Sequence, residues 1–210
     1  MIRIVVVDDH AIVRRGLQDL LAGAPDLDVV ATAADAGEAL AAVDAHGPDV
    51  VVMDLGMPGV NGVEATRAIH ARRPGTSVIV LSHSADARSI LDAIDAGAAG
   101  YLLKDVEPVE LLQAVRAAAA GDAPLSPEVA RTLFELGAQR ARAGRLTPRG
   151  RQVLALLGQG LTNRLIARRL GITEKTVKGH LAVAFDCIGV EDRIEAAQWA
   201  RARTAWLDAS

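Results

Sequence analysis

The chain has 210 residues, of which 50% are hydrophobic, so it can bury one large core or two smaller ones. Residues 1–144 hold 12 Lys and Arg against 20 Asp and Glu, whereas residues 145–210 hold 11 against 6, which favours a metal or phosphoryl site followed by a nucleic-acid binder. One cysteine, Cys187, excludes an intrachain disulfide, and no apolar run reaches the roughly 20 residues that span a bilayer, so we expect a cytoplasmic protein without membrane contacts.

The first 120 residues alternate short β-branched runs with amphipathic stretches, which is typical of a parallel sheet covered by helices. We expect five strands, at 2–8, 27–33, 49–54, 77–82 and 99–103. Helices are expected after each of them, at 11–22, 36–46, 61–72, 85–96 and 107–120. Five β/α units of this length predict a flavodoxin-like doubly wound α/β domain over residues 1–121.

Chemically active residues follow four of these strands. Ligands of a parallel sheet bind at the carboxyl ends of its strands, so we expect the following side chains to meet at one edge: Asp8, Asp9, Asp54, Ser82 and Lys104. Asp54 ends the central strand, where a carboxylate can attack phosphorus and form an acyl phosphate. Lys104 would neutralise the phosphoryl oxygens, and Ser82 would donate a hydrogen bond to one of them.

The same edge suits a magnesium ion. Mg²⁺ prefers oxygen ligands and keeps several of its waters, so a few protein groups are enough to hold it. We predict that these groups are the carboxylates of Asp8, Asp9 and Asp54 and the carbonyl of Gly56.

Residues 122–144 have a different character. Pro124 and Pro127 flank Ser126, which is expected to cap a short helix that runs to about Leu136. The residues after it, 137–144, are rich in Ala, Arg and Gly and weakly patterned, so we interpret them as a linker.

From residue 145 to the end the pattern is helical and predicts a small all-α domain. Four helices are expected, beginning near Pro148, Asn163, Glu174 and Arg193 and ending near Leu157, Leu170, Ile188 and Arg203. Threonines that precede the first three of them are typical N-caps. A short helix, a turn at Gly171 and a longer helix form the pattern of a helix-turn-helix.

The longer helix of that pair has one apolar side and one polar side. Opposite its apolar stripe lie residues that a recognition helix would place in the major groove: Lys175, Lys178, Gly179, Ala182 and Asp186. Lys178 can reach a guanine edge or a phosphate, and Gly179 and Ala182 can contact thymine methyls. A second set is expected to contact phosphates: Thr162, Asn163, Arg164, Arg168, Thr173, Thr176 and His180.

Two groups of motifs resemble known families. Residues 1–120 resemble a response-regulator receiver domain in V-V-V-D-D-H, V-V-M-D-L-G-M-P-G-V-N-G, V-I-V-L-S and A-G-A-A-G-Y-L-L-K. Residues 145–200 resemble the output domain of NarL/LuxR-type regulators in L-T-P-R, G-L-T-N-R-L-I-A-R-R-L-G-I-T-E-K-T-V-K-G-H and G-V-E-D-R-I-E-A-A. The resemblance implies a transcriptional regulator that a sensor histidine kinase phosphorylates at Asp54. It also implies that Tyr101 is a switch residue, which follows Ser82 inward.

The chain departs from the output-family pattern at several positions. Gly150 and Leu165 stand where glutamates would complete two capping boxes, and each lost bond costs up to about 1 kcal/mol. The recognition helix is neutral, with Asp186 near its end. We therefore expect weak DNA binding by a monomer, and a homodimer, formed on phosphorylation, that places two helices in half-sites about one turn apart.

Three other functions are compatible with parts of this pattern. A phosphatase with an aspartyl nucleophile needs a second acid two residues further on, where Gly56 stands, so at most slow self-phosphorylation or dephosphorylation is expected at Asp54. A regulator controlled by a ligand or a protein partner would not need the acidic site. A protein that uses its helical half for protein contacts would show no salt-dependent binding to random DNA.

Overall fold

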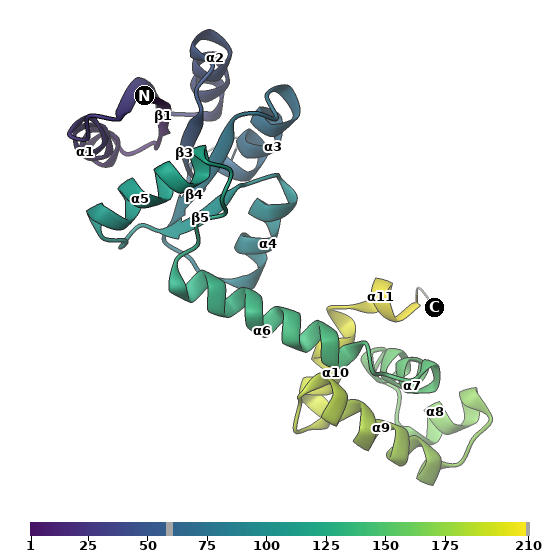
Figure 1. Ribbon diagram of the computed structural model, residues 1–210. Helices are drawn as coiled ribbons and strands as arrows, with labels where there is room; N and C mark the ends of the chain where they lie inside the picture. The colour runs from purple at the N-terminus through teal and green to yellow at the C-terminus, as the bar shows by residue number, and fades with distance from the viewer. Residues whose placement is uncertain (58–60, 209–210) are drawn as a thin grey trace. The chain divides into compact units, whose positions relative to one another are not determined.

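The computed structural model describes residues 1–57 and 61–208. The chain divides into two compact units, Met1–Leu133 and Phe134–Ser210. The first is an α/β unit and the second is helical, as Figure 1 shows. Among the described residues, no helix combines the length and the apolar character needed to cross a membrane.

The first unit contains a parallel sheet with the strand order β2-β1-β3-β4-β5. Its strands are β1 (Ile2–Val7), β2 (Leu27–Ala33), β3 (Val50–Asp54), β4 (Ser77–Ser82) and β5 (Gly100–Leu103). Its helices are α1 (Ala11–Ala22), α2 (Ala36–His46), α3 (Gly62–Arg72), α4 (Ala87–Asp95) and α5 (Pro108–Ala119). The predicted flavodoxin-like fold is confirmed, and the strand order reverses at β1, beside β3, which is where such sheets bind ligands.

Alternate residues of β1 belong to different cores. Ile4 and Val6 lie in one hydrophobic cluster with residues of α1 and α5, whereas Val5 and Val7 lie in another with residues of α2 and α3. Successive side chains of a strand point to opposite faces, so helices on both faces require apolar residues at every position. This is why the strands are continuous apolar runs in the sequence.

The segment between the predicted domains is more helical than expected. Helix α6 (Pro127–Ala143) continues seven residues beyond Leu136, so the prediction of a short helix followed by a linker is wrong for residues 137–143. Ala, Gln and Arg dominate this stretch and are strong helix formers. The single Gly137 costs about 1 kcal/mol relative to Ala, which does not end the helix.

The residues before α6 extend the sheet at the edge of β5. The amide of Tyr101 donates to the carbonyl of Pro124 at 2.9 Å, and the amide of Ser126 donates to the carbonyl of Tyr101 at 3.1 Å. The hydroxyl of Ser126, expected at a helix cap, accepts a hydrogen bond from the amide of Leu103 at 2.9 Å. The exposed edge of β5 is thereby paired by its own chain.

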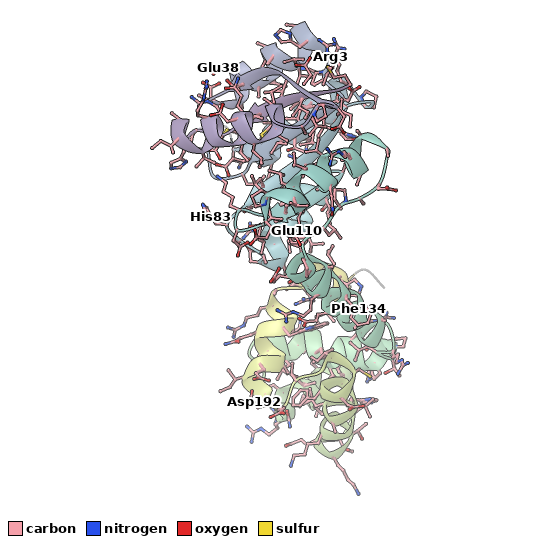
Figure 2. The ribbon with its side chains drawn as sticks, turned by 60° about the vertical axis from the view of Figure 1, so that its left-hand side comes forward. Arg3, Glu38, His83, Glu110, Phe134 and Asp192 are labelled. Atoms are coloured by element: carbon pink, nitrogen blue, oxygen red, sulfur yellow. The ribbon has the colours of Figure 1, made fainter. Side chains whose placement is uncertain are left out.

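The second unit is a small helical bundle. Its elements are α7 (Pro148–Gly158), α8 (Asn163–Leu170), α9 (Glu174–Ile188), α10 (Arg193–Arg201) and α11 (Thr204–Asp208), of which α11 was not predicted. Asp192, labelled in Figure 2, caps α10 by accepting hydrogen bonds from the amides of Ile194 and Glu195. The core joins residues from several of these helices, among them Val153, Leu157, Ile166, Val177 and Leu181. Gly171 ends α8 in the left-handed region, with φ 65°.

Gly62 is the first residue of α3 and lies against the backbone at the end of β3. A Cβ atom built there would clash with the carbonyl oxygen of Asp54 and lie 2.8 Å from Cα of Leu55. Both obstacles are backbone atoms, which cannot move without shifting β3. Only glycine therefore allows α3 to begin against the end of the central strand.

We expect Gly62→Ala to lower the free energy of unfolding by about 1–3 kcal/mol, because backbone atoms must move to admit the methyl group. Gly16→Ala is the matched control. A Cβ at Gly16, an exposed position within α1, meets nothing within 4 Å, so this change should stabilise the protein by about 0.5–1 kcal/mol. Urea unfolding of both variants checks the pair, and equal effects of the two changes would contradict this reading of Gly62.

Candidate functional site: a phosphoryl-binding edge and a helix-turn-helix surface

The predicted site residues of the first unit occupy the carboxyl end of the sheet. Asp8 directly follows β1, and Asp54 is the last residue of β3. Strand β3 is hydrogen-bonded to β1. Ser82 is the last residue of β4, and Lys104 directly follows β5. The amide of Lys104 donates to the carbonyl of Ser82 at 2.8 Å, which continues the pairing of the two strands. The strand order thus brings the sequence-predicted residues to one edge.

Lys104 joins the two buried carboxylates. Its Nζ lies 2.7 Å from Oδ2 of Asp8 and 3.0 Å from Oδ2 of Asp54. The exposed fractions of the three side chains are 7% for Lys104, 1% for Asp8 and 5% for Asp54. Two carboxylates this deeply buried need a partner of opposite charge, and the ammonium group supplies it.

The charge of Lys104 is supported by its surroundings. Burial alone would favour the neutral amine, but the hydrogen bonds and negative charges of Asp8 and Asp54 outweigh burial and raise the pKa of Lys104 above its ordinary value. The side chain therefore remains a cation wherever Asp8 and Asp54 are ionised. A group with three acceptor oxygens attached to Asp54 would meet this cation directly.

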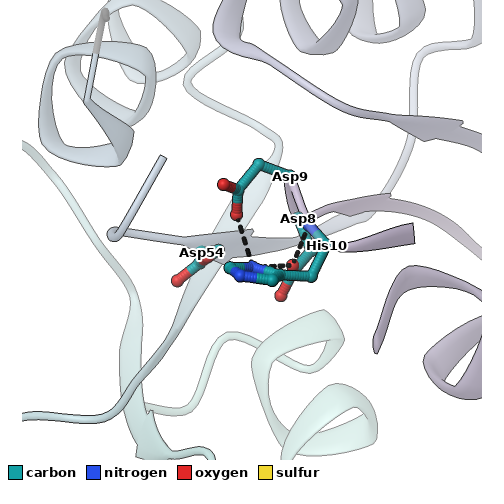
Figure 3. A group of neighbouring side chains, drawn as sticks. All are labelled: Asp8, Asp9, His10 and Asp54. Carbon is teal, nitrogen blue, oxygen red and sulfur yellow. Dashed lines mark hydrogen bonds and ion pairs between the residues drawn. The ribbon is translucent and has the colours of Figure 1, made fainter. Parts of the chain in front are cut away.

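The acidic side chains converge as Figure 3 shows. Ligand atoms of Asp8, Asp9, His10 and Asp54 lie within 4.8 Å of one another. Oδ1 of Asp9 is buried and receives no hydrogen bond from the described residues, although Nδ1 of His10 lies 2.8 Å away. A buried oxygen without a hydrogen bond, beside two further carboxylates, provides the kind of oxygen ligands that Mg²⁺ prefers. Gly56 belongs to the same site, because its amide donates to Oδ1 of Asp54 at 3.0 Å.

Two neighbours of this site were not assigned from the sequence. Nδ1 of His10 contacts Asp9 and lies 3.5 Å from Oδ1 of Asp8, whose Oδ1 also accepts the amide of His10 at 2.8 Å. The guanidinium of Arg14 donates to the carbonyl of Asp8. His10 directly follows the aspartate pair in the sequence, so the signal was present. Nothing in the local pattern marks Arg14.

Ser82 and Tyr101 both contact the loop after β4. The hydroxyl of Ser82 accepts a hydrogen bond from the amide of Ser84 at 3.2 Å. The hydroxyl of Tyr101, whose side chain is buried, donates to the carbonyl of Ser84 at 2.7 Å. Burial raises the pKa of Tyr101, so the phenol remains a hydrogen-bond donor. The backbone of one residue, Ser84, therefore links the two predicted switch residues.

Helix α9 buries and exposes the sides that were predicted for a recognition helix. The apolar stripe of α9 is buried at Val177, Leu181, Ala184 and Ile188. The opposite side is exposed at the predicted groove residues, Lys175, Lys178, Gly179, Ala182 and Asp186. Val183, on the flank of this side, is 58% exposed and was not predicted. Helix α8 and helix α9 are joined by the tight turn at Gly171, as in a helix-turn-helix.

The predicted phosphate contacts fall into two groups. Arg164, Arg168 and His180 are exposed or half-buried and form no salt bridge with the described residues. The exposed hydroxyls of the three threonines take part in hydrogen bonds at the starts of α8 and α9: Thr162, Thr173 and Thr176. Asn163 is different, because its Oδ1 accepts a hydrogen bond from Arg193 at 2.7 Å, and Arg193 also donates to the carbonyl of Leu161. Arg193 thus ties the start of α10 to the start of α8, which the sequence pattern did not indicate.

Half of each altered capping box is present. Thr147 accepts the amide of Gly150 at 3.0 Å, and Thr162 accepts the amide of Leu165 at 3.4 Å. The reciprocal bonds need a glutamate or glutamine side chain as acceptor at positions 150 and 165. Gly150 and Leu165 offer no such acceptor. Both helices still form because the threonine oxygens satisfy one free amide each and the core holds the apolar sides.

The fold and the acidic edge define a receiver unit, and the second unit defines a helix-turn-helix output. The family model described as "Response regulator receiver domain" matches residues 4–116. The model described as "Bacterial regulatory proteins, luxR family" matches residues 144–200. The chain belongs to the NarL/LuxR family of two-component response regulators, which are phosphorylation-controlled, DNA-binding transcriptional regulators and not classical enzymes.

Similar proteins agree with this assignment over nearly the whole chain. The nitrate/nitrite response regulator protein NarL of Escherichia coli is 40% identical over 201 residues, which cover 93% of each chain. The DNA-binding transcriptional activator DevR/DosR of Mycobacterium tuberculosis is 41% identical over 204 residues, covering 95% of this chain and 94% of that one. The crystal structure of a LuxR-family response regulator from Aurantimonas sp. matches with 42% identity and a TM-score of 0.63, covering 65% of this chain and 98% of that one.

Replacement of Lys104 by Met keeps the aliphatic stem and removes only the charge. We expect Lys104→Met to lower the free energy of unfolding by about 3 kcal/mol without metal, because it leaves Asp8 and Asp54 as uncompensated buried charges. Arg88→Met is the control, since Arg88 pairs with Asp92 at 3.8 Å while 92% exposed and should change stability by less than about 0.5 kcal/mol. Denaturant titrations with a chelator present measure the stability of both variants. Unchanged stability of Lys104→Met would refute the buried pairing.

Proposed function

We propose that Asp54 is the phosphoacceptor of this regulator and that a sensor histidine kinase is the donor. An oxygen of the Asp54 carboxylate attacks phosphorus as the bond from phosphorus to the kinase histidine breaks, and an acyl phosphate forms. Lys104 neutralises the transferred oxygens, and Ser82 donates a hydrogen bond to one of them. The observation that carries this proposal is the buried contact of Lys104 with Asp54 at 3.0 Å.

A magnesium ion would be held by Asp8, Asp9, Asp54 and the carbonyl of Gly56. The ion would supply positive charge to phosphoryl oxygens during transfer. The unsatisfied Oδ1 of Asp9 and the neighbouring carboxylates support this assignment. Gly56 stands where a second acid would be needed for rapid hydrolysis, so self-phosphorylation and dephosphorylation at Asp54 are slow. Tyr101 is the switch residue that follows Ser82.

The helical half binds operator DNA as a homodimer. The domain limits are 1–121 for the receiver, 122–144 for the segment that contains most of α6, and 145–210 for the output domain. Groove contacts come from Lys175, Lys178, Gly179 and Ala182. Phosphate contacts come from the second predicted set, Thr162, Asn163, Arg164, Arg168, Thr173, Thr176 and His180. The exposure of nearly all of these side chains supports the assignment.

Beryllofluoride with Mg²⁺ is expected to double the sedimenting mass from 21.9 kDa. The fluorines of the mimic stand in for the negatively charged acceptor oxygens that we assign to a phosphoryl group on Asp54. Asp54→Asn should abolish the change, whereas Asp28→Asn, an exposed aspartate on β2, should leave it intact. Sedimentation velocity measures the mass, and ¹⁹F NMR reports binding of the mimic. A bound mimic without dimerisation would refute the assembly step.

Arg168→Ala is expected to weaken binding of the mimic-bound protein to every DNA sequence by a similar factor. An arginine that contacts phosphate releases counterions, so its loss should reduce the slope of log K against log salt by about 1. Arg15→Ala removes an exposed arginine from α1 and should leave the slope unchanged. Fluorescence anisotropy with a random-sequence duplex at several salt concentrations measures both slopes. A salt-independent affinity would favour a protein partner for the helical half.

A further inference from the structure

The side chain of His10 contacts the acidic edge and not the helix that it begins. His10 is the N-cap residue of α1, yet its side chain accepts no hydrogen bond from the free amides of that helix. Its Nδ1 lies 2.8 Å from Oδ1 of Asp9 and 3.5 Å from Oδ1 of Asp8, as Figure 3 shows. The imidazole is 68% exposed, so burial does not force it into this position. Capping therefore does not explain the placement of the ring.

The contact between His10 and Asp9 is short without being a hydrogen bond. Oδ1 of Asp9 is buried and receives no hydrogen bond from the described residues, although Nδ1 of His10 is so close to it. Neighbouring ligands of one ion, each bound at 2.0–2.1 Å, lie about 3.0–3.4 Å apart in octahedral and tetrahedral sites. The distances from Nδ1 to Asp9 and to Asp8, 2.8 and 3.5 Å, bracket that spacing. The imidazole is thus placed as one ligand beside two others.

The other contacts of the carboxylates leave the oxygens beside His10 able to bind an ion. Lys104 contacts Oδ2 of Asp8 and Oδ2 of Asp54, so its ammonium lies on the other oxygens of these groups. Oδ1 of Asp8 accepts one hydrogen bond, from the amide of His10, and a carboxylate oxygen has a second lone pair. Oδ1 of Asp9 accepts none from the described residues. One nitrogen and two oxygens are therefore available together.

From this donor set we propose that His10 is a metal ligand of the acidic edge and makes the edge select a divalent transition metal such as Zn²⁺ over Mg²⁺. Imidazole nitrogen suits zinc, whereas Mg²⁺ prefers oxygen alone. Three protein ligands with one open position are a common zinc arrangement. The inference rests on the proposed magnesium site of Asp8 and Asp9 for its location, and it does not require phosphorylation of Asp54. Because both ions need the same carboxylates, the edge holds one of them at a time.

Calorimetric titration of the full chain with Zn²⁺ and, separately, with Mg²⁺ tests the ligand. His10→Ala should raise the Kd for Zn²⁺ by about ten-fold or more, since the loss of a group that merely orients a ligand already costs that much. The Kd for Mg²⁺ should change by less than about two-fold, because the oxygen ligands remain. His46→Ala, at the exposed end of α2, is the matched control and should alter neither value. His10→Asn keeps a preferred N-cap residue without an imidazole, so it replaces His10→Ala if that variant fails to fold.

The ring nitrogens of the histidines give a second readout that does not depend on affinity. In ¹⁵N NMR, Zn²⁺ should shift the Nδ1 resonance of His10, which is identified by its absence from His10→Ala. Excess Mg²⁺ should reverse the shift, because it takes the carboxylates of Asp8 and Asp9. The ring of His46 should not respond to either ion.

The outcomes separate this inference from the proposed function. Unchanged affinity for Zn²⁺ in His10→Ala, with Mg²⁺ bound normally, would overturn the inference and leave the magnesium site standing. That result is expected if His10 is only a surface cation paired with Asp8 and Asp9, or if zinc binds elsewhere on the chain. Failure of Mg²⁺ to bind the wild-type protein would overturn the proposed magnesium site, whereas zinc binding lost in His10→Ala would still support the ligand.

Discussion

The first unit depends on one ammonium group that lies between two buried carboxylates. Asp8 and Asp54 come from neighbouring strands, and the parallel sheet forces their carboxylates to the same buried edge. Two like charges at that depth would oppose folding, and Lys104 offsets them from the end of a third strand. The sheet order, the position of α3 against Asp54 and the burial of the edge must all be satisfied together for this contact to form.

The same contact makes the site responsive. A phosphoryl group on Asp54 would bring additional negative charge to an ammonium that already serves two carboxylates, so the local balance must rearrange. The loop after β4 forms single hydrogen bonds with the side chains of Ser82, Tyr101 and Thr132, and its Ala85 packs against the cluster around Tyr101. The strands beneath it are fixed by two hydrophobic clusters.

The parts that were predictable from the sequence are those with strong local signals. Strands buried on both faces are continuous apolar runs, and residues at their ends, such as Asp54 and Lys104, are placed by topology alone. The length of α6 was missed because its pattern is weak and Gly137 suggests an end, although the propensities of its other residues outweigh it. The bond between Ser126 and Leu103 was not predictable, since it joins residues 23 positions apart through an added pairing at a sheet edge.

The helical half explains why assembly and DNA affinity should change together. The charged residues of α9 are Glu174, Lys175, Lys178 and Asp186, which cancel, so the helix itself contributes no net attraction for a phosphate backbone and the basic residues around it must supply it. Pairing two copies doubles the number of phosphate contacts, and the second copy binds at the high effective concentration set by the first. If a monomer binds weakly, as we predict, then the proposed switch at Asp54 would control the occupancy of the operator.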